Sequence, residues 1–191
     1  IARQSLNNTN NDLKDIERIT QDIDNARRAF LLAHDTDPFN RWEAGRDLAR
    51  DSLIGTIVDG TAHNDDYLSG LKTLLRDDSL DPAYRALMLG QPSQSELAGI
   101  LHKQGHTPDP AAIHAATETL RDAKAKAFAD LLADIYAANQ VAGPFSPDAE
   151  PAGKRSLANA ALSLLTRLDG GEAAEKQYKS ADNMTLQLAA F

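Results

Sequence analysis

Asp-Pro dipeptides recur along this chain, each just ahead of apolar residues spaced three and four positions apart: Asp37-Pro38, Asp81-Pro82 and Asp109-Pro110. An aspartate side chain accepts a hydrogen bond from a free amide at a helix start, and proline fits the first turn because it has no amide to satisfy. No stretch shows the sustained alternation that a half-buried strand requires. The sequence therefore predicts an all-α fold made of several separate helices.

The spacing of apolar residues, and the Gly and Pro residues between them, predict the individual helices. Ser93 and Glu96 form the S-x-x-E pattern of a helix start. The longest helix is expected to run from Asp109 to Gly143 as the central packing element. The expected helices cover residues 11–28, 38–59, 65–76, 82–89, 94–101, 110–142, 147–169, 172–178 and 182–191. Because the connections are short, we expect a stacked, solenoid-like array of the helical-repeat type, with about eight to ten helices.

Composition narrows the possible partners. The chain has 20 Lys and Arg residues against 28 Asp and Glu residues, which gives a net charge of −8. This charge repels phosphate backbones and anionic lipids, so we expect no nucleic-acid or membrane partner. The absence of cysteine excludes disulfides and thiolate metal sites. No apolar run approaches the roughly 20 residues of a membrane span, and the first residues lack a secretion signal, so a cytoplasmic location is expected.

One histidine pair has the spacing of a helical metal site. His102 and His106 lie four residues apart. In the H-E-x-x-H arrangement a glutamate next to the first histidine acts as general base, whereas Lys103 occupies that place here. Gly105 and Pro108 also interrupt the helix that both imidazoles would have to share. We therefore predict no zinc site at this pair.

The other titratable residues have simpler explanations. His34 precedes Asp35, but neighbouring helix residues point about 100° apart and rarely face one another. His63 and His114 belong to no motif. Carboxylates are favoured near helix N-termini because the exposed amides there carry partial positive charge. Capping therefore explains three acidic pairs better than cation binding does: Asp35 with Asp37, Asp65 with Asp66, and Asp77 with Asp78.

Motifs of nucleotide and acyl-transfer sites are also missing from the sequence. It contains no phosphate-binding glycine loop, no dinucleotide fingerprint and no nucleophile elbow. The aromatic residues are dispersed at core-facing spacing, which is typical of packing: Trp42, Tyr67, Tyr84, Phe128 and Tyr136. Phe39 and Trp42 are expected on the inward face of the helix that begins at Pro38, with Trp42 as its anchor. We predict no catalytic residue, no cofactor-binding residue and no metal ligand in this chain.

Six stretches carry a more specific signal. They are AFLLAHDTDPFNRWEAGRDLA (29–49), LDPAYRALMLGQPSQSEL (80–97), DPAAIHAATETLR (109–121), LADIYAAN (132–139), KRSLANAALSLL (154–165) and DNMTLQLAA (182–190). Together, in this order, they resemble the helical C-terminal domain of the bacterial aminopeptidase N family. The D-x-F-x-R-W-E-A and N-M-T segments are the most specific, and the resemblance covers about residues 29–191.

The resemblance implies a role without chemistry for this chain. Enzymes of the family are cytoplasmic zinc exopeptidases that remove N-terminal residues from peptides. Their H-E-x-x-H helix, distal glutamate ligand and G-x-M-E-N segment lie in an earlier domain, and none of these occurs here. The resemblance therefore implies a non-catalytic domain that walls off the active-site chamber, with zinc only in the parent. The implied partners are the catalytic domain, the later C-terminal helices, and peptides that enter the parent's chamber.

The two ends of the chain lead to further expectations. Residues 1–28 do not resemble the family and are expected to form an amphipathic helical leader of separate origin, ahead of a partial C-terminal domain over 29–191. The chain starts at Ile1 and stops at Phe191 within an apolar run, so we expect a fragment of a longer polypeptide. A fragment predicts bare apolar surface near Leu186, Leu188 and Phe191.

Two other interpretations stay open at this point. A stand-alone helical-repeat module that binds another protein would end in a polar cap instead. A small unrecognised enzyme would bring His34, His102 or His114 beside a buried carboxylate in one pocket.

Overall fold

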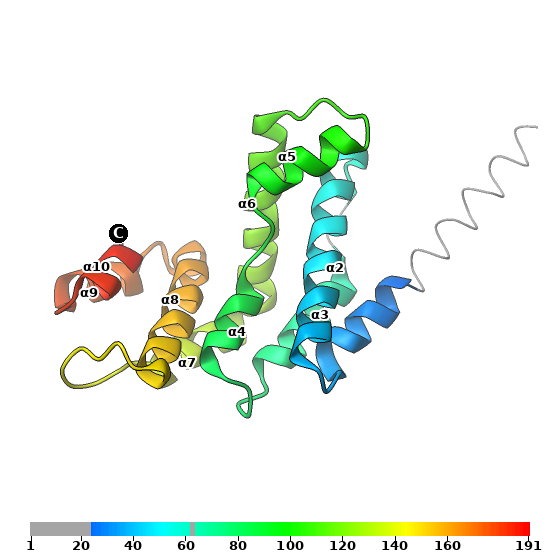
Figure 1. Ribbon diagram of the computed structural model, residues 1–191. Coiled ribbons are helices and arrows are strands. Elements are labelled where there is room, and N and C mark those ends of the chain that lie inside the picture. Colours follow the sequence, from blue (N-terminus) through cyan, green and yellow to red (C-terminus); the bar gives the residue numbers. More distant parts are fainter. Residues whose placement is uncertain (1–23, 62–63) are drawn as a thin grey trace, which may run out of the picture.

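The computed structural model describes residues 24–61 and 64–191, and within these ranges it contains helices and no strand (Figure 1). Residues 24–34 are helical. The following helices are α2 (Pro38–Asp59), α3 (Asp65–Leu75), α4 (Pro82–Leu89), α5 (Gln94–Lys103), α6 (Pro110–Ala127), α7 (Ala129–Ala138), α8 (Ala149–Asp169), α9 (Glu172–Ser180) and α10 (Met184–Ala189). The all-α prediction is confirmed.

The predicted helix starts and stops are largely confirmed, because the capping chemistry is in place. The carboxylate of Asp37 accepts from the Phe39 amide at 2.8 Å, and Asp81 and Asp109 cap α4 and α6 in the same way. Gly60 and Gly170, directly after α2 and α8, have φ values of 66° and 68°. Residues that carry a side chain rarely adopt this left-handed backbone conformation, so glycine is favoured at the end of each of these helices.

The prediction of one long helix from Asp109 to Gly143 is wrong. The helix breaks at Phe128 (φ −108°, ψ 11°), between α6 and α7, and both parts are shorter than α2 with 22 residues and α8 with 21. The Phe128 side chain is fully buried, and the ammonium of Lys72 in α3 donates to the Ala127 carbonyl at 2.8 Å. A buried ring and a cation from another helix stabilise the break. The spacing of apolar residues within α6 and α7 does not reveal either contact, so it could not predict the break.

The helices pack as an array that progresses along the chain (Figure 1). Helix α2 contacts α3, α5 and α6, and α8 contacts α4, α6, α7, α9 and α10, so α6 joins the two groups. At one end, Leu32 is fully buried against Gly45 and Gly70. A Cβ atom on Gly70 would lie 2.9 Å from the Ala29 carbonyl oxygen, so this close approach of helices requires glycine.

The expected anchor of α2 is only partly realised. Trp42 is half-buried, and Phe39, expected on the inward face, is 60% exposed. The buried face of α2 instead runs through Ala44, Leu48 and Ser52. Phe39 lies in the first turn of α2, where its ring contacts that of Trp42 with centroids 5.7 Å apart.

Residues 1–23 lie outside the described residues, so the leader of residues 1–28 and the boundary at residue 29 stay predictions. Among the described helices, none combines the length and the apolar character that crossing a membrane would demand.

Candidate functional site

The described histidines lie on the surface. His34, His102, His106 and His114 are all exposed, and His63 lies outside the described residues. The His114 ring contacts the Gln94 side-chain amide, with His114 Nδ1 and Gln94 Nε2 3.2 Å apart. In residues 24–61 and 64–191, no group of three or more His, Asp or Glu side chains is arranged to hold a metal ion. The residues of this part of the chain therefore do not fit the zinc that the resemblance implies for the parent.

The acidic pairs take structural roles, with one difference from expectation. Asp35 accepts from the Asp37 amide at 2.8 Å, and Asp65 and Asp66 occupy the first turn of α3. Asp77 and Asp78 instead follow the end of α3 and do not cap a helix start. Asp77 accepts hydrogen bonds from Ser79, which lower the pKa of its carboxyl group, and Asp78 pairs with Arg85 at 2.8 Å.

Cations that lie within the packed interior terminate several helices. The guanidinium of Arg41 donates to the Leu32 and Ala33 carbonyls, both at 3.0 Å, at the end of the first described helix. Arg85 donates to the Leu75 carbonyl at the end of α3. Lys124 donates to the Leu89 and Gly90 carbonyls at the end of α4, at 3.0 and 2.9 Å. The last carbonyls of a helix lack intrahelical partners and carry partial negative charge, so each cation satisfies them.

Sequence reasoning missed these cations, although a signal was present for one of them. Lys124 lies four residues from Leu120 and from Phe128, on the buried stripe of α6. A lysine on such a stripe must find partners in the interior. Burial lowers the pKa of Lys124 to about 7, with a further contribution from Arg121. A neutral amine still has two N–H groups, which matches the two carbonyls that Lys124 contacts.

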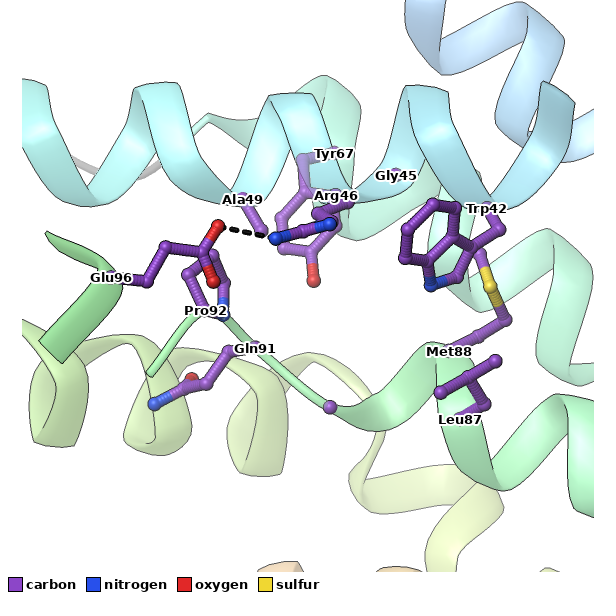
Figure 2. Close-up of a pocket in the computed structure, with 11 residues that line it drawn as sticks. Trp42, Gly45, Arg46, Ala49, Tyr67, Leu87, Met88, Gln91, Pro92 and Glu96 are labelled. Carbon is purple, nitrogen blue, oxygen red and sulfur yellow. Dashed lines mark hydrogen bonds and ion pairs between the residues drawn. The ribbon is translucent and has the colours of Figure 1, made fainter. Parts of the chain in front are cut away.

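A pocket of about 200 Å³ opens where α2, α3, α4 and α5 meet (Figure 2). Helix α2 contributes one wall and α4 the opposite one, and residues 90–92 and the start of α5 close the third side. The lining is mainly apolar: Trp42, Gly45, Ala49, Leu87, Met88 and Pro92. The Lys124 ammonium donates to the Leu89 and Gly90 carbonyls and so holds in place the segment that forms the third side.

One polar group points into this pocket from its base. The hydroxyl of Tyr67 is directed toward the segment 90–92 (Figure 2). The Tyr67 side chain is only 2% exposed, its hydroxyl makes no hydrogen bond with any residue that the structure describes, and the oxygen is not fully enclosed. Burial raises the pKa of this phenol, so it stays protonated and able to donate. The Lys124 ammonium lies over the Tyr67 ring, 5.5 Å from its centroid.

An ion pair borders the same pocket. Arg46 of α2 donates to the Glu96 carboxylate of α5 at 2.6 Å and lies over the Trp42 ring, 5.1 Å from its centroid (Figure 2). The predicted cap of α5 is present, since Ser93 accepts from the Glu96 amide at 3.2 Å. The Glu96 side chain, however, pairs with Arg46. Glu96, predicted only as part of a local cap, therefore also links α5 to α2.

The C-terminal edge offers a second kind of surface. No residue of α10 is buried; Leu188 is 66% exposed, Phe191 is 97% exposed and Leu186 is half-buried. The apolar surface expected at this edge is therefore present. A hollow of about 730 Å³ lies beside it, bordered by α7, α9 and α10. Neither this hollow nor the pocket at Tyr67 is lined by a described histidine.

Comparisons with known proteins agree on the kind of domain. The family described as "Domain of unknown function (DUF3458_C) ARM repeats" matches residues 25–191, which confirms the helical-repeat prediction. Aminopeptidase N of Caulobacter vibrioides is 42% identical over 142 residues, covering 73% of this chain and 16% of that protein. Aminopeptidase N of Escherichia coli is 31% identical over 175 residues, covering 85% of this chain and 19% of that protein.

A solved structure extends the comparison to the fold. Legionella pneumophila aminopeptidase A, in complex with aspartic acid, matches with a TM-score of 0.69 and 24% identity, over 85% of this chain and 20% of that one. At this identity the likeness concerns the fold alone. The chain thus spans about a fifth or less of the length of each of these proteins.

Proposed function

The chain belongs to the DUF3458_C family of ARM-repeat helical domains, and on that premise we propose that it is a non-catalytic domain of a zinc-dependent aminopeptidase. The observation that carries the proposal is its 42% identity to part of an aminopeptidase N. The proposed parent removes N-terminal residues from peptides in the cytoplasm. Its zinc and catalytic groups belong to a different part of the polypeptide.

The proposed role of this domain is to wall off the active-site chamber. A rigid wall excludes folded proteins, admits peptides and limits solvent around the metal-polarised carbonyl. The cations of α2, α4 and α6 support this role, because each fixes its own helix to the end of another helix. The exposed apolar side chains of α10 support attachment to further parts of the parent.

Hydrolysis of an aminoacyl p-nitroanilide, with zinc content measured on the same samples, tests the non-catalytic assignment. We expect the full-length parent to bind zinc and release p-nitroaniline, and this chain with added zinc to do neither. Turnover or stoichiometric zinc in this chain would overturn the assignment. A parent that is inactive on every aminoacyl substrate would overturn the proposed activity.

The wall itself needs a separate test, because an inactive domain could serve another purpose. We expect a parent that lacks this domain, if it still cleaves a dipeptide amide, to gain activity on the N-terminus of a folded protein. The ratio of the two rates is the readout. An unchanged ratio would contradict the wall and favour a domain that only binds another protein.

A further inference from the structure

We propose that the pocket between α2, α3, α4 and α5 receives an apolar side chain from another part of the parent polypeptide, with the Tyr67 hydroxyl donating a hydrogen bond to that segment. The inference rests on the proposed function, since it takes the chain to be one domain of a larger protein. It assigns a docking point that is separate from the exposed edge at α10.

The chemistry of the pocket selects the kind of occupant. Its walls are the Trp42 indole, the Met88 thioether and the Pro92 ring, which favour a neutral apolar group. Arg46 and Glu96 are paired with each other at 2.6 Å, so the rim offers no uncompensated charge to attract an ionic ligand. An aliphatic or aromatic side chain on a peptide segment fits a volume of about 200 Å³.

Tyr67 is the independent observation that points to a partner. The Tyr67 side chain is 98% buried, but its hydroxyl oxygen is not one of the fully enclosed polar atoms that lack a partner, so the oxygen opens onto the pocket. The other two packed tyrosines use their hydroxyls within the chain: Tyr84 donates to the Pro38 carbonyl at 2.8 Å, and Tyr136 donates to the Gln177 amide oxygen at 2.9 Å. The Tyr67 hydroxyl makes no such bond with a described residue and points into the pocket, where it is free to donate to an occupant (Figure 2).

The pocket is also prepared for an occupant. Lys124 holds the Leu89 and Gly90 carbonyls, and the Arg46–Glu96 pair ties α2 to α5, so the walls are fixed before anything binds. A preformed pocket loses little conformational freedom on binding. At its rim, Leu87 of α4 is 58% exposed, which leaves apolar surface for the incoming segment to cover.

The source of that segment follows from the length of the relatives. This chain spans 16% and 19% of the two aminopeptidase N proteins, so more than four-fifths of such a polypeptide lies outside it. A segment of the same polypeptide is present at high effective concentration and binds a small pocket that a free peptide would occupy only weakly. We therefore assign the pocket to an intramolecular contact.

Photocross-linking in the full-length parent tests the assignment. The variant Leu87→p-benzoylphenylalanine places a photoreactive group at the rim, and the matched variant Leu168→p-benzoylphenylalanine places it on α8, where Leu168 is 43% exposed away from this pocket. We expect Leu87, and not Leu168, to cross-link within one polypeptide to a segment outside this domain, identified by peptide mass spectrometry. Cross-links to a second copy, to an added peptide, or to nothing would each overturn the inference.

A pair of tyrosine variants tests the hydrogen bond. Tyr67→Phe should leave the melting temperature of this chain unchanged but lower that of the full-length parent, because the bond forms only with the remainder. Tyr84→Phe removes a bond internal to the chain, so it should lower both. Equal effects of Tyr67→Phe in the two proteins would overturn the inference. Neither experiment depends on hydrolysis, so an inactive parent would fail the proposed function and leave these outcomes readable.

Discussion

The centre and the C-terminal edge of this molecule are built from the same helical pattern but differ in what surrounds it. In the centre, α2, α6 and α8 bury leucines, and α2, α4 and α6 carry cations that close neighbouring helices. At the edge, α10 buries no residue, and Met184, Leu188 and the following Phe191 are exposed. The comparison teaches that apolar spacing predicts a helix in both places, whereas stability and partners depend on what lies against it.

The buried cations sharpen this difference. Arg41, Arg85 and Lys124 each reach from one helix to the final carbonyls of another, so the centre is held by contacts between helices. Helix α10 is capped locally, by Asn183 accepting from the Leu186 amide at 3.0 Å. Helix α10 also contacts α8 and α9, and the Gln177 amide donates to the Leu186 carbonyl at 2.9 Å.

The largest expected contrast comes from shortening a leucine in each region. Leu48→Ala, in the buried face of α2, should lower the free energy of unfolding by about 2–5 kcal/mol, because it removes buried methyl groups and leaves a cavity. Leu188→Ala should change it by less than about 0.5 kcal/mol, since the side chain is 66% exposed. Urea denaturation measures both. Similar losses would break the distinction between the regions.

A second contrast concerns pH. The pKa of Lys124 falls from its ordinary value of 10.5 to about 7 in the folded chain. The unfolded chain therefore binds more protons between these two values, and stability should rise with pH across that window, by about 1.4 kcal/mol for each pH unit at most. The penalty for burying the charge is fully present below pH 7.

Unfolding by urea at pH 7 and pH 9 checks this dependence. Lys124→Met removes the titrating group, so it should lose most of the gain between the two pH values. Lys126→Met, at an exposed position of the same helix, should keep the wild-type dependence. An unchanged pH response in Lys124→Met would contradict the role assigned to the buried amine.

Caps offer a smaller contrast. Asp37→Ala removes the cap of α2 and should cost about 1 kcal/mol of global stability. Asn183→Ala removes the cap of α10 and should raise the amide exchange rate of residues 184–189 with little change in the global value. Hydrogen exchange and denaturation on the same variants separate the two effects. A global loss in Asn183→Ala equal to that in Asp37→Ala would show that the edge folds with the centre.

The smallest expected effect concerns a surface ion pair. Glu118 pairs with Arg167 between α6 and α8, and the hydrogen bond from Arg167 lowers the pKa of the carboxyl group. Its contribution should be present above pH 4.5 and disappear as pH falls through the lowered folded-state pKa. Glu118→Gln should cost less than about 1 kcal/mol at pH 7, because exposed pairs are weak. A larger loss in thermal denaturation would show that this pair does more than join two surfaces.

Most of the fold was predictable from local chemistry, whereas the site was not. Asp37, Asp81 and Asp109 mark helix starts because capping acts within three residues. The break at Phe128 and the burial of Lys124 depend on residues of other helices, which spacing within one helix does not reveal. The pocket at Tyr67 combines side chains from four segments, and its aromatic residues read individually as packing.

Amide hydrogen exchange, measured on this chain alone and within the full-length parent, tests most directly whether the edge and the pocket are docking surfaces. We expect residues 172–191 and the segment 87–92 to gain protection in the parent, while the buried residues of α2, α6 and α8 exchange equally slowly in both. Identical exchange at the edge and the pocket in the two proteins would contradict the assignment of this chain as a docked domain.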